Sequence, residues 1–355
     1  MTNAADLAVG PTVPRIRPVR PEEFAAEAEL IVRAFAAGPY GHLPKSAERA
    51  AFEADTTGRA AAGEVLVAVG DDGGVVGTAS VLRAGTPYAR VAVDGEAEIR
   101  LLSVDPAEQG SGVGAALMRA SLEAALEWGA TALVLDTGTR NVRAQALYER
   151  LGFERASERD ATVGAGVDSL VYRFPLQQRD DLRVRLMRPD EAGAVAALIE
   201  GAYAADFELN PGYRADLVAV AERARDHQVW VAVDATSGEL LGTASTPVAG
   251  AAISPLARDG ELDFRFLGVA AGARRRGVGE VLVEHVVRLA RIRGLDRVVL
   301  NTGPDMVAAQ RLYDRLGFGR MHEREFTFVP PDGSSFLMMA YGRDVASDAV
   351  RPMSA

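Results

Sequence analysis

A long segment of this chain occurs twice. Residues 98–153 align without a gap with residues 263–318, which lie 165 positions later, and 22 of the 56 aligned positions are identical. Solenoid repeats have periods of roughly 20 to 50 residues. A copy of this length is instead a whole domain that has been duplicated. Positions at which the two copies agree are therefore the first place to look for function.

The length supports the same division. A chain of 355 residues is long enough for two domains that each bury a core. With 48% hydrophobic and 25% charged residues, the chain has a globular composition. We expect a first domain over residues 14–176, a linker over 177–182 and a second domain over 183–344, with a disordered tail at 1–13 and a further tail at 345–355.

Charge and composition exclude several classes of function. The net charge of −10 argues against binding to nucleic acid, whose phosphates require a basic surface. The chain has no cysteine, which excludes a thiol nucleophile and thiolate zinc sites, and its four histidines are scattered, so we expect no metal. No apolar run approaches the roughly 18 residues of a membrane span, and the N-terminus lacks a signal-peptide pattern. We expect a cytoplasmic protein that binds no membrane, with the oligomeric state left open between a monomer and a homodimer.

Each copy has the same order of expected elements. A short strand and a helix start with proline and acidic residues lead into a β-hairpin, and both hairpins run into the tetrapeptide GTAS. A strand, a glycine-bearing loop, a helix, a strand and a final helix follow. A strand–helix–strand unit implies a parallel pair, whereas the hairpin is antiparallel. The expected fold class is α/β (α+β) with a mixed sheet. The hairpin strands are expected at 65–69 and 75–81, and at 229–233 and 240–244.

The loop before the long helix has the form of an anion-binding site. Residues 109–114 and 274–279 share the pattern [Q/R]xxGxG. Two glycines allow backbone N–H groups at the helix start to close around a phosphate, and the helix dipole adds to the attraction. The GxxxxGK[ST] pattern of a P-loop is absent. A tight turn without a ligand is the structural alternative.

A dinucleotide-binding fingerprint is the main rival interpretation of this loop. Gly110 and Gly112 begin a GxGxxA pattern, and Asp136 ends the following strand. The second copy breaks the pattern, because Arg275 replaces the first glycine and Asn301 replaces the acid. We therefore favour an anion site of another kind.

The combined pattern resembles the GNAT N-acetyltransferases. A strand ending in LxV, the [Q/R]xxGxG loop, a helix, a strand and a helix with A-x-x-LY-x-x-LGF follow one another in each copy. Each half resembles a complete member of that family, over residues 13–175 and 182–344. The resemblance implies two centrally splayed sheets flanked by helices. It also implies an acetyl-CoA-dependent N-acetyltransferase that acts on a primary amine by direct attack in a ternary complex, without a metal.

The resemblance also implies the residues that bind acetyl-CoA. The strand backbone would bond the pantetheine arm, the amide of its last valine would polarise the thioester carbonyl, and the loop would take the pyrophosphate. Only the second loop carries arginines, so we expect the second half to bind CoA more tightly. The expected cofactor-binding residues are Leu102, Ser103, Val104, Gln109, Gly110, Ser111, Gly112, Val113, Gly114 and Asn141 in the first half, and Leu267, Gly268, Val269, Arg274, Arg275, Arg276, Gly277, Val278 and Gly279 in the second. Met306 replaces the asparagine there.

Two pairs of residues match the family's catalytic positions. Tyr148 and Tyr313 match its general-acid tyrosine, and the alternative is an aromatic packed in an apolar stripe. Glu98 and Asp263 match the carboxylate base that removes the ammonium proton of an amine with a pKa near 10.4. The alternative for these carboxylates is an ion pair with the arginine two residues along the strand.

The acceptor would be bound by the variable segment after the first strand. Phe35, Tyr40, Tyr203 and Asp206 are the candidate acceptor-binding residues, because aromatic walls with carboxylates suit a cationic small amine. Two alternatives stay open. One is acetylation of a protein or peptide, and the other is that one half is a non-catalytic CoA-binding or scaffolding domain.

Overall fold

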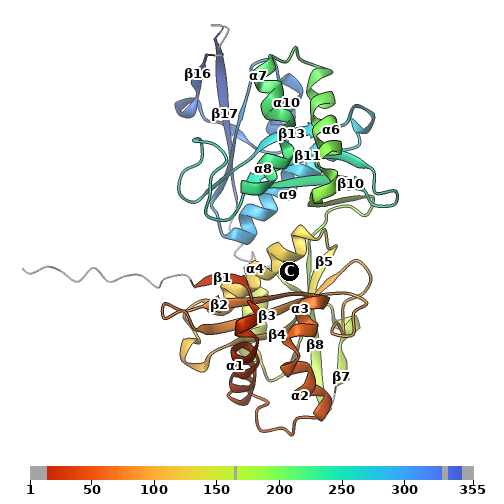
Figure 1. Ribbon diagram of the computed structural model, residues 1–355, viewed down its shortest axis with the longest axis vertical. Helices are drawn as coiled ribbons and strands as arrows, with labels where there is room; N and C mark the ends of the chain where they lie inside the picture. The colour runs from red at the N-terminus through yellow and green to blue at the C-terminus, as the bar shows by residue number, and fades with distance from the viewer. Residues whose placement is uncertain (1–13, 164–165, 330–334, 346–355) are drawn as a thin grey trace, which may run out of the picture. The chain divides into compact units, whose positions relative to one another are not determined.

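The computed structural model describes residues 14–163, 166–329 and 335–345, so the predicted tail 1–13 and all of the tail 345–355 except Val345 lie outside it. Contacts between residues divide the chain into two compact units. The first comprises Met1–Ala125 and Ala130–Leu176, and the second comprises Leu126–Gly129 and Gln177–Ala355. In Figure 1 the first unit runs from red to yellow and the second from green to blue. The two units follow the two copies of the repeat.

The first unit is built on one mixed sheet in the order β1-β2-β3-β4-β5-β8-β6, with β7 paired to β8 (Figure 1). Its strands are β1 (Arg15–Pro18), β2 (Gly63–Val69), β3 (Val75–Arg83), β4 (Ala97–Val104), β5 (Ala132–Gly138), β6 (Glu154–Arg155), β7 (Ala161–Val163) and β8 (Val167–Pro175). Its α-helices are α1 (Phe24–Ala36), α2 (Ala47–Ala54), α3 (Thr56–Ala62), α4 (Val113–Glu127) and α5 (Val142–Arg150).

The second unit repeats this order, but its sheet is divided into two pieces, β13-β11-β10-β9 and β12-β14-β17-β15, with β16 paired to β17. Its strands are β9 (Leu182–Leu186), β10 (His227–Asp234), β11 (Leu240–Pro247), β12 (Glu261–Asp263), β13 (Arg265–Val269), β14 (Arg297–Thr302), β15 (Gly319–Arg320), β16 (Phe326–Phe328) and β17 (Phe336–Asp344). Its α-helices are α6 (Ala192–Ala204), α7 (Pro211–Val218), α8 (Val220–Asp226), α9 (Val278–Arg293) and α10 (Val307–Arg315). The predicted α/β class and both predicted hairpins are confirmed, and each hairpin strand is as long as predicted or longer.

Helices cover both faces of the first sheet. A Cβ on Gly77 of β3 would touch Val113 and Leu117 of α4, so this residue faces α4. The next residue, Thr78, donates a hydrogen bond to Glu27 of α1 at 2.9 Å. Because successive residues of a strand point to opposite faces, α1 and α4 lie on opposite sides of β3.

The central parallel strands separate in both units, as predicted. β4 pairs with β5 only from Ala97 to Ile99, although β4 continues to Val104. In the second unit the matching strand is interrupted, so that β12 pairs with β14 and ends at Asp263, and β13 pairs only with β11. Leu101 and Phe266 occupy equivalent positions with φ of 56° and 58°, an unusual conformation for residues with a side chain. These bulges bend each strand away from its parallel neighbour.

No helix within the described part of the chain is long and apolar enough to cross a membrane. Within the same residues, no three His, Cys, Asp or Glu side chains come together as a metal-binding group would require.

A buried histidine lies in the core of the second unit. His285 projects from α9 and is 1% exposed, and its ring lies 4.3 Å from that of Trp230 in a T-shaped arrangement. Neither ring nitrogen has a hydrogen-bond partner among the described residues. Burial lowers the pKa of His285 to about 3, because the charged imidazolium would lose its hydration.

This burial predicts a loss of stability in mild acid. Below the unfolded pKa near 6.5 the unfolded chain binds a proton that folded His285 excludes, so the free energy of unfolding falls as the pH decreases towards about 3. Between pH 7.5 and 5.5 the loss from this group is about 1.4 kcal/mol. His285→Leu should remove that loss, as measured by urea unfolding followed through the fluorescence of Trp230.

The matched control is His322→Gln, because the side chain of His322 is 73% exposed in the same unit. This variant should retain the acid sensitivity of the wild type. If His285→Leu loses as much stability as the wild type between the two pH values, the buried histidine is not its source.

Candidate functional site

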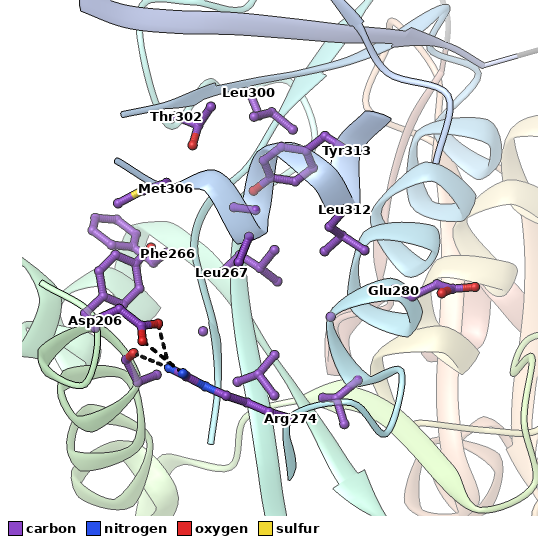
Figure 2. Close-up of a pocket in the computed structure, with 18 of the residues that line it drawn as sticks. Asp206, Phe266, Leu267, Arg274, Glu280, Leu300, Thr302, Met306, Leu312 and Tyr313 are labelled. Carbon is purple, nitrogen blue, oxygen red and sulfur yellow. Dashed lines mark hydrogen bonds and ion pairs between the residues drawn. The ribbon is translucent and has the colours of Figure 1, made fainter. Parts of the chain in front are cut away.

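A pocket of about 630 Å³ opens where β13 and β14 separate in the second unit (Figure 2). Its walls come from β13, the loop after it, the first turn of α9, the end of β14 and α10. The predicted residues among its lining are Leu267, Gly268, Val269, Arg274, Arg275, Gly277, Val278, Gly279, Tyr313, Tyr203 and Asp206. The predicted residues therefore form part of this wall, and they come from segments that lie far apart in the sequence.

The strand backbone at the pocket is unpaired along one edge. Gly268 and Val269 pair with β11 on one side, whereas the parallel ladder to β14 stops at Asp263. In the first unit, Leu102, Ser103 and Val104 follow the point at which the β4–β5 ladder ends. Since backbone N–H and C=O groups need partners, this edge can bind an extended ligand that carries amides.

The loop before the helix has the same backbone conformation in both units. Gly110 and Gly112 have φ of 97°, and their counterparts Arg275 and Gly277 have φ of 67° and 80°. Gly277 is the N-cap of α9, so the amides of the first helical turn have no acceptor within the helix. Free amides and the positive end of a helix dipole are groups that attract an anion, and they lie at one end of the pocket.

The loop of the first unit is largely held by its own neighbours. The Ser111 hydroxyl donates to the carbonyl oxygen of Glu108 at 2.7 Å, and the amide oxygen of Gln109 accepts from Arg143 at 2.9 Å. Val113 is buried and Gly114 is half-buried at the start of α4. The predicted loop residues are therefore together, but two of their polar side chains already have partners.

Two of the three loop arginines also have carboxylate partners. Arg274 forms an ion pair with Asp206 at 2.8 Å, drawn as dashed lines in Figure 2, and Arg276 forms one with Asp234 at 2.9 Å. Arg275 is exposed and lines the pocket, and no carboxylate of the described residues pairs with it. Sequence reasoning treated the three arginines alike, whereas the fold leaves only Arg275 without a carboxylate partner.

Both predicted acid tyrosines are buried at the strand separation. Tyr148 is 5% exposed and Tyr313 is 4% exposed. Burial raises the pKa of each phenol above its ordinary value of 10, so both hydroxyls keep their proton at neutral pH. Figure 2 shows Tyr313 extending from α10 into the pocket. Each ring also packs on aromatic neighbours, and the role of each tyrosine as a general acid stays a prediction.

The carboxylates at the predicted base positions anchor loops. Glu98 is fully buried, and one of its oxygens accepts hydrogen bonds from the amides of residues 90–92 at 2.7 to 2.9 Å. Asp263 is 1% exposed and accepts bonds from the amide of Ile253 at 3.2 Å and the hydroxyl of Ser254 at 2.6 Å. Of the two predicted ion pairs, Glu98 with Arg100 is present at 3.6 Å, whereas no pair of Asp263 with the equivalent arginine occurs in the described structure.

Sequence reasoning missed several polar residues of the pocket wall, of which Thr302 is the most deeply buried. Thr302 ends β14, is 2% exposed, and its hydroxyl has no partner among the described residues. In the first unit the equivalent Thr137 accepts a hydrogen bond at 3.2 Å from Asn141, which the second copy replaces with Met306. A buried hydroxyl without a partner is rare, so Thr302 is a candidate ligand contact. The identity of this threonine in both copies is the signal that could have revealed it.

The candidate acceptor residues are arranged differently in the two units. Phe35 is exposed with the guanidinium of Arg49 4.8 Å from its ring centre, and Tyr203 lies in the pocket wall with its pKa raised well above 10 by burial. The Tyr40 hydroxyl accepts from the amide of Arg140 at 2.7 Å, and its ring covers Gly138 so closely that a Cβ there would overlap it. Asp206 lines the pocket and forms an ion pair with a loop arginine, so its carboxylate has a cationic partner within the protein.

Comparisons with known proteins found one family model and several similar proteins. The model of the acetyltransferase (GNAT) family matches residues 29–153 and 195–318. A mycothiol acetyltransferase of Beutenbergia cavernae is 32% identical over 267 residues, which are 71% of this chain and 79% of that protein. Glucosamine 6-phosphate N-acetyltransferase 1 of Oryza sativa subsp. japonica is 32% identical over 157 residues, 44% of this chain and 86% of that protein. A GNAT acetyltransferase structure from Staphylococcus aureus Mu50 aligns with 46% of this chain and 99% of its own, at 14% identity and a TM-score of 0.37.

The loop geometry predicts opposite effects of Arg275→Gly on CoA binding and on stability. The positive φ of Arg275 costs a residue with a side chain roughly 1 to 2 kcal/mol, and glycine removes this cost. Glycine also raises the conformational entropy of the unfolded chain, which lowers the free energy of unfolding by roughly 0.4 to 1 kcal/mol. Thermal stability should therefore stay equal or rise. CoA should bind roughly 3- to 10-fold more weakly in calorimetry, because one exposed cationic hydrogen-bond donor is lost.

Arg276→Gln is the matched control, since that side chain already pairs with Asp234. It should change CoA affinity less than Arg275→Gly does. An unchanged affinity in Arg275→Gly would remove this arginine from the phosphate site.

Proposed function

The chain belongs to the GNAT acetyltransferase family and is an acetyl-CoA-dependent N-acyltransferase, and we propose that it transfers the acetyl group to a primary amine of a small molecule at the pocket of the second unit. The observation that carries this proposal is the pocket itself. An unpaired strand edge, the amides of a helix N-terminus and a protonated tyrosine line one cavity there.

The residues of this pocket fit acetyl-CoA. The free edge at Leu267–Val269 offers the amide groups that a pantetheine arm can bond, and the first turn of α9 after Gly277 offers N–H groups to a pyrophosphate. The unpaired hydroxyl of Thr302 faces the same cavity from the opposite strand. A volume of about 630 Å³ lies within the range of roughly 300 to 1,000 Å³ that is usual for small-molecule sites.

Acetyl-CoA, when bound, supplies an activated acyl group as a thioester. In the transfer the amine nitrogen bonds to the acyl carbon, the carbon–sulfur bond breaks, the amine loses a proton to solvent water, and the sulfur gains one from Tyr313, which solvent then reprotonates. The backbone amide of Val269 donates to the carbonyl oxygen on which negative charge develops. Tyr313 holds its proton at the hydroxyl until the sulfur leaves, because burial keeps the phenol neutral.

The carboxylates have a different role in this proposal. Both oxygens of Asp263 accept hydrogen bonds from the loop at residues 253 and 254, and Glu98 is bonded to three backbone amides. These contacts favour the anchoring of the loop before the strand over direct proton removal from the amine. The carboxylates then keep the strand in place rather than acting as the base.

The names of two relatives favour a small acceptor. The mycothiol acetyltransferase matches most of this chain, and the rice enzyme is named for glucosamine 6-phosphate. The net charge of −10 also suits an amine, which is cationic in solution.

We propose that the first unit has a scaffolding role. The ring of Tyr40 covers Gly138 at the end of β5. At the equivalent Gly303 of the second unit, a Cβ atom added to the glycine would have only the side chain of Met306 nearby, at 4.0 Å. Tyr40 therefore covers the end of β5, beside the point at which the parallel strands separate.

The roles of the two tyrosines can be separated by removing each hydroxyl. Tyr313→Phe should lower kcat by roughly 10²- to 10⁴-fold, as expected for the loss of a general acid, with little change in CoA affinity. Tyr148→Phe keeps the same ring at the equivalent position of the first unit and should turn over like the wild type. Release of CoA thiol across a panel of amines provides the measurement.

A Tyr313→Phe enzyme with wild-type kcat would contradict the acid role. A large loss in Tyr148→Phe alone would place the chemistry in the first unit.

A further inference from the structure

Two arginines lie against one phenylalanine ring at the end of the pocket away from the loop. The guanidinium carbon of Arg223, from α8, lies 3.8 Å from the centre of the Phe266 ring, and that of Arg265 lies 5.0 Å from it. Arg265 is exposed and, like Phe266, lines the pocket, whereas Arg223 is half-buried. Two like charges thus share a small apolar surface, an arrangement that an anion would stabilise.

Neither arginine has a carboxylate partner within the described structure. Arg223 donates to the carbonyl oxygens of Asp216 at 2.9 Å and Leu217 at 3.0 Å, and its Nε is buried without a partner. Arg265 is the first residue of β13 and forms no ion pair with any described residue. Arginine stays charged at neutral pH, so both positive charges are uncompensated by side chains.

In the first unit, the residues equivalent to these two arginines each have a carboxylate partner. Arg59 occupies the position of Arg223 in a helix of equal length, and it forms a fully buried ion pair with Glu27 of α1 at 2.7 Å. Arg100, the counterpart of Arg265 in the repeat, lies 3.6 Å from Glu98. The first unit therefore provides a carboxylate at each of these two arginine positions.

The second copy has the equivalent arginines without these carboxylate partners. Val195 takes the position of Glu27 and is completely buried in an apolar cluster. Asp263, one methylene shorter than Glu98, bonds Ser254 and the amide of Ile253 instead of an arginine. A positive pair without its former partners, beside an open pocket, suits an anionic ligand.

This ligand group is separate from the pyrophosphate of CoA. Arg265 and Val269 are the two ends of β13, and a strand of that length spans about 13 Å. The loop with its helix N-terminus follows Val269, so it takes phosphates at the far end from Arg265. Tyr203 also lines the pocket and packs on Tyr213, with ring centres 6.1 Å apart. The arginine end is thus lined by groups that can hold an acceptor.

We propose that the acceptor of the second unit is an amine that also carries an oxyanion, a carboxylate or a phosphate, and that Arg265 binds this anion. Arg223 is a positioning residue, because it holds Phe266 from behind and adds positive potential. The inference rests on the proposed function and names its substrate class. It replaces the expectation of a purely cationic amine bound by Asp206, whose carboxylate pairs with Arg274.

The test compares matched amines with the full-length wild-type protein. Thiol release from acetyl-CoA is measured for amino acids against their amides and for glucosamine against glucosamine 6-phosphate. The anionic member of at least one pair should have a kcat/KM at least 10-fold higher, mainly through KM, and the pair that shows the preference distinguishes carboxylate from phosphate. Equal kcat/KM values within both pairs would overturn the inference while the proposed function stands. Absence of thiol release with every amine would overturn both.

Variants of the protein then identify the residue that causes the preference for the anionic amine. Arg265→Gln should reduce kcat/KM for the anionic amine by roughly 10- to 100-fold and leave the neutral amine nearly unchanged, since a hydrogen bond to a charged group is lost. Arg265→Lys should restore part of the preference. Arg225→Gln, at an exposed arginine of the same helix as Arg223, is the control and should match the wild type. If Arg265→Gln is folded by circular dichroism and keeps the full preference, or loses activity on both members equally, Arg265 does not bind the anion.

Discussion

The separation of two parallel strands is the constraint on which the rest of the structure depends. In the second unit the ladder between β12 and β14 ends at Asp263, and the chain resumes as β13 bonded only to β11. The positive φ of Phe266 turns the strand at this point. Because a parallel strand without a neighbour leaves N–H and C=O groups unpaired, the fold creates a binding edge where a continuous sheet would have none. The helix N-terminus, the buried tyrosine and the pocket are all arranged around that edge.

The duplication shows how one scaffold can acquire two electrostatic states. Both units keep the strand bulge, the positive-φ loop and the buried tyrosine. They differ in how the arginine charge is compensated. The first unit buries Arg59 in an ion pair with Glu27. In the second unit Val195 replaces the glutamate, and Arg223 lies against the ring of Phe266. A buried ion pair is costly to break by removing one partner, so loss of a carboxylate is tolerated only if the arginine moves to a wetter position. In the second unit Arg223 is half-buried, in keeping with this expectation.

The repeat made much of the architecture predictable, because identical positions at a fixed offset mark the strand, loop and helix in each copy. The C-terminal caps of α5 and α10 were predicted in this way, and Gly152 and Gly317 have φ of 86° and 78°. Long-range partners could not be predicted. Asp206 meets Arg274 across 68 positions, and Tyr40 meets Arg140 across 100. No local pattern encodes such pairs, since only the packing of distant elements brings them together.

We propose that the second unit holds the working acetyl-CoA site, and amide hydrogen exchange of the full-length protein with and without CoA tests this assignment most directly. Binding to the free edge and the loop should slow exchange in residues 267–280, because their unpaired amides gain acceptors. Residues 102–115 of the first unit should change little. Protection confined to residues 102–115, or equal in the two segments, would contradict the claim.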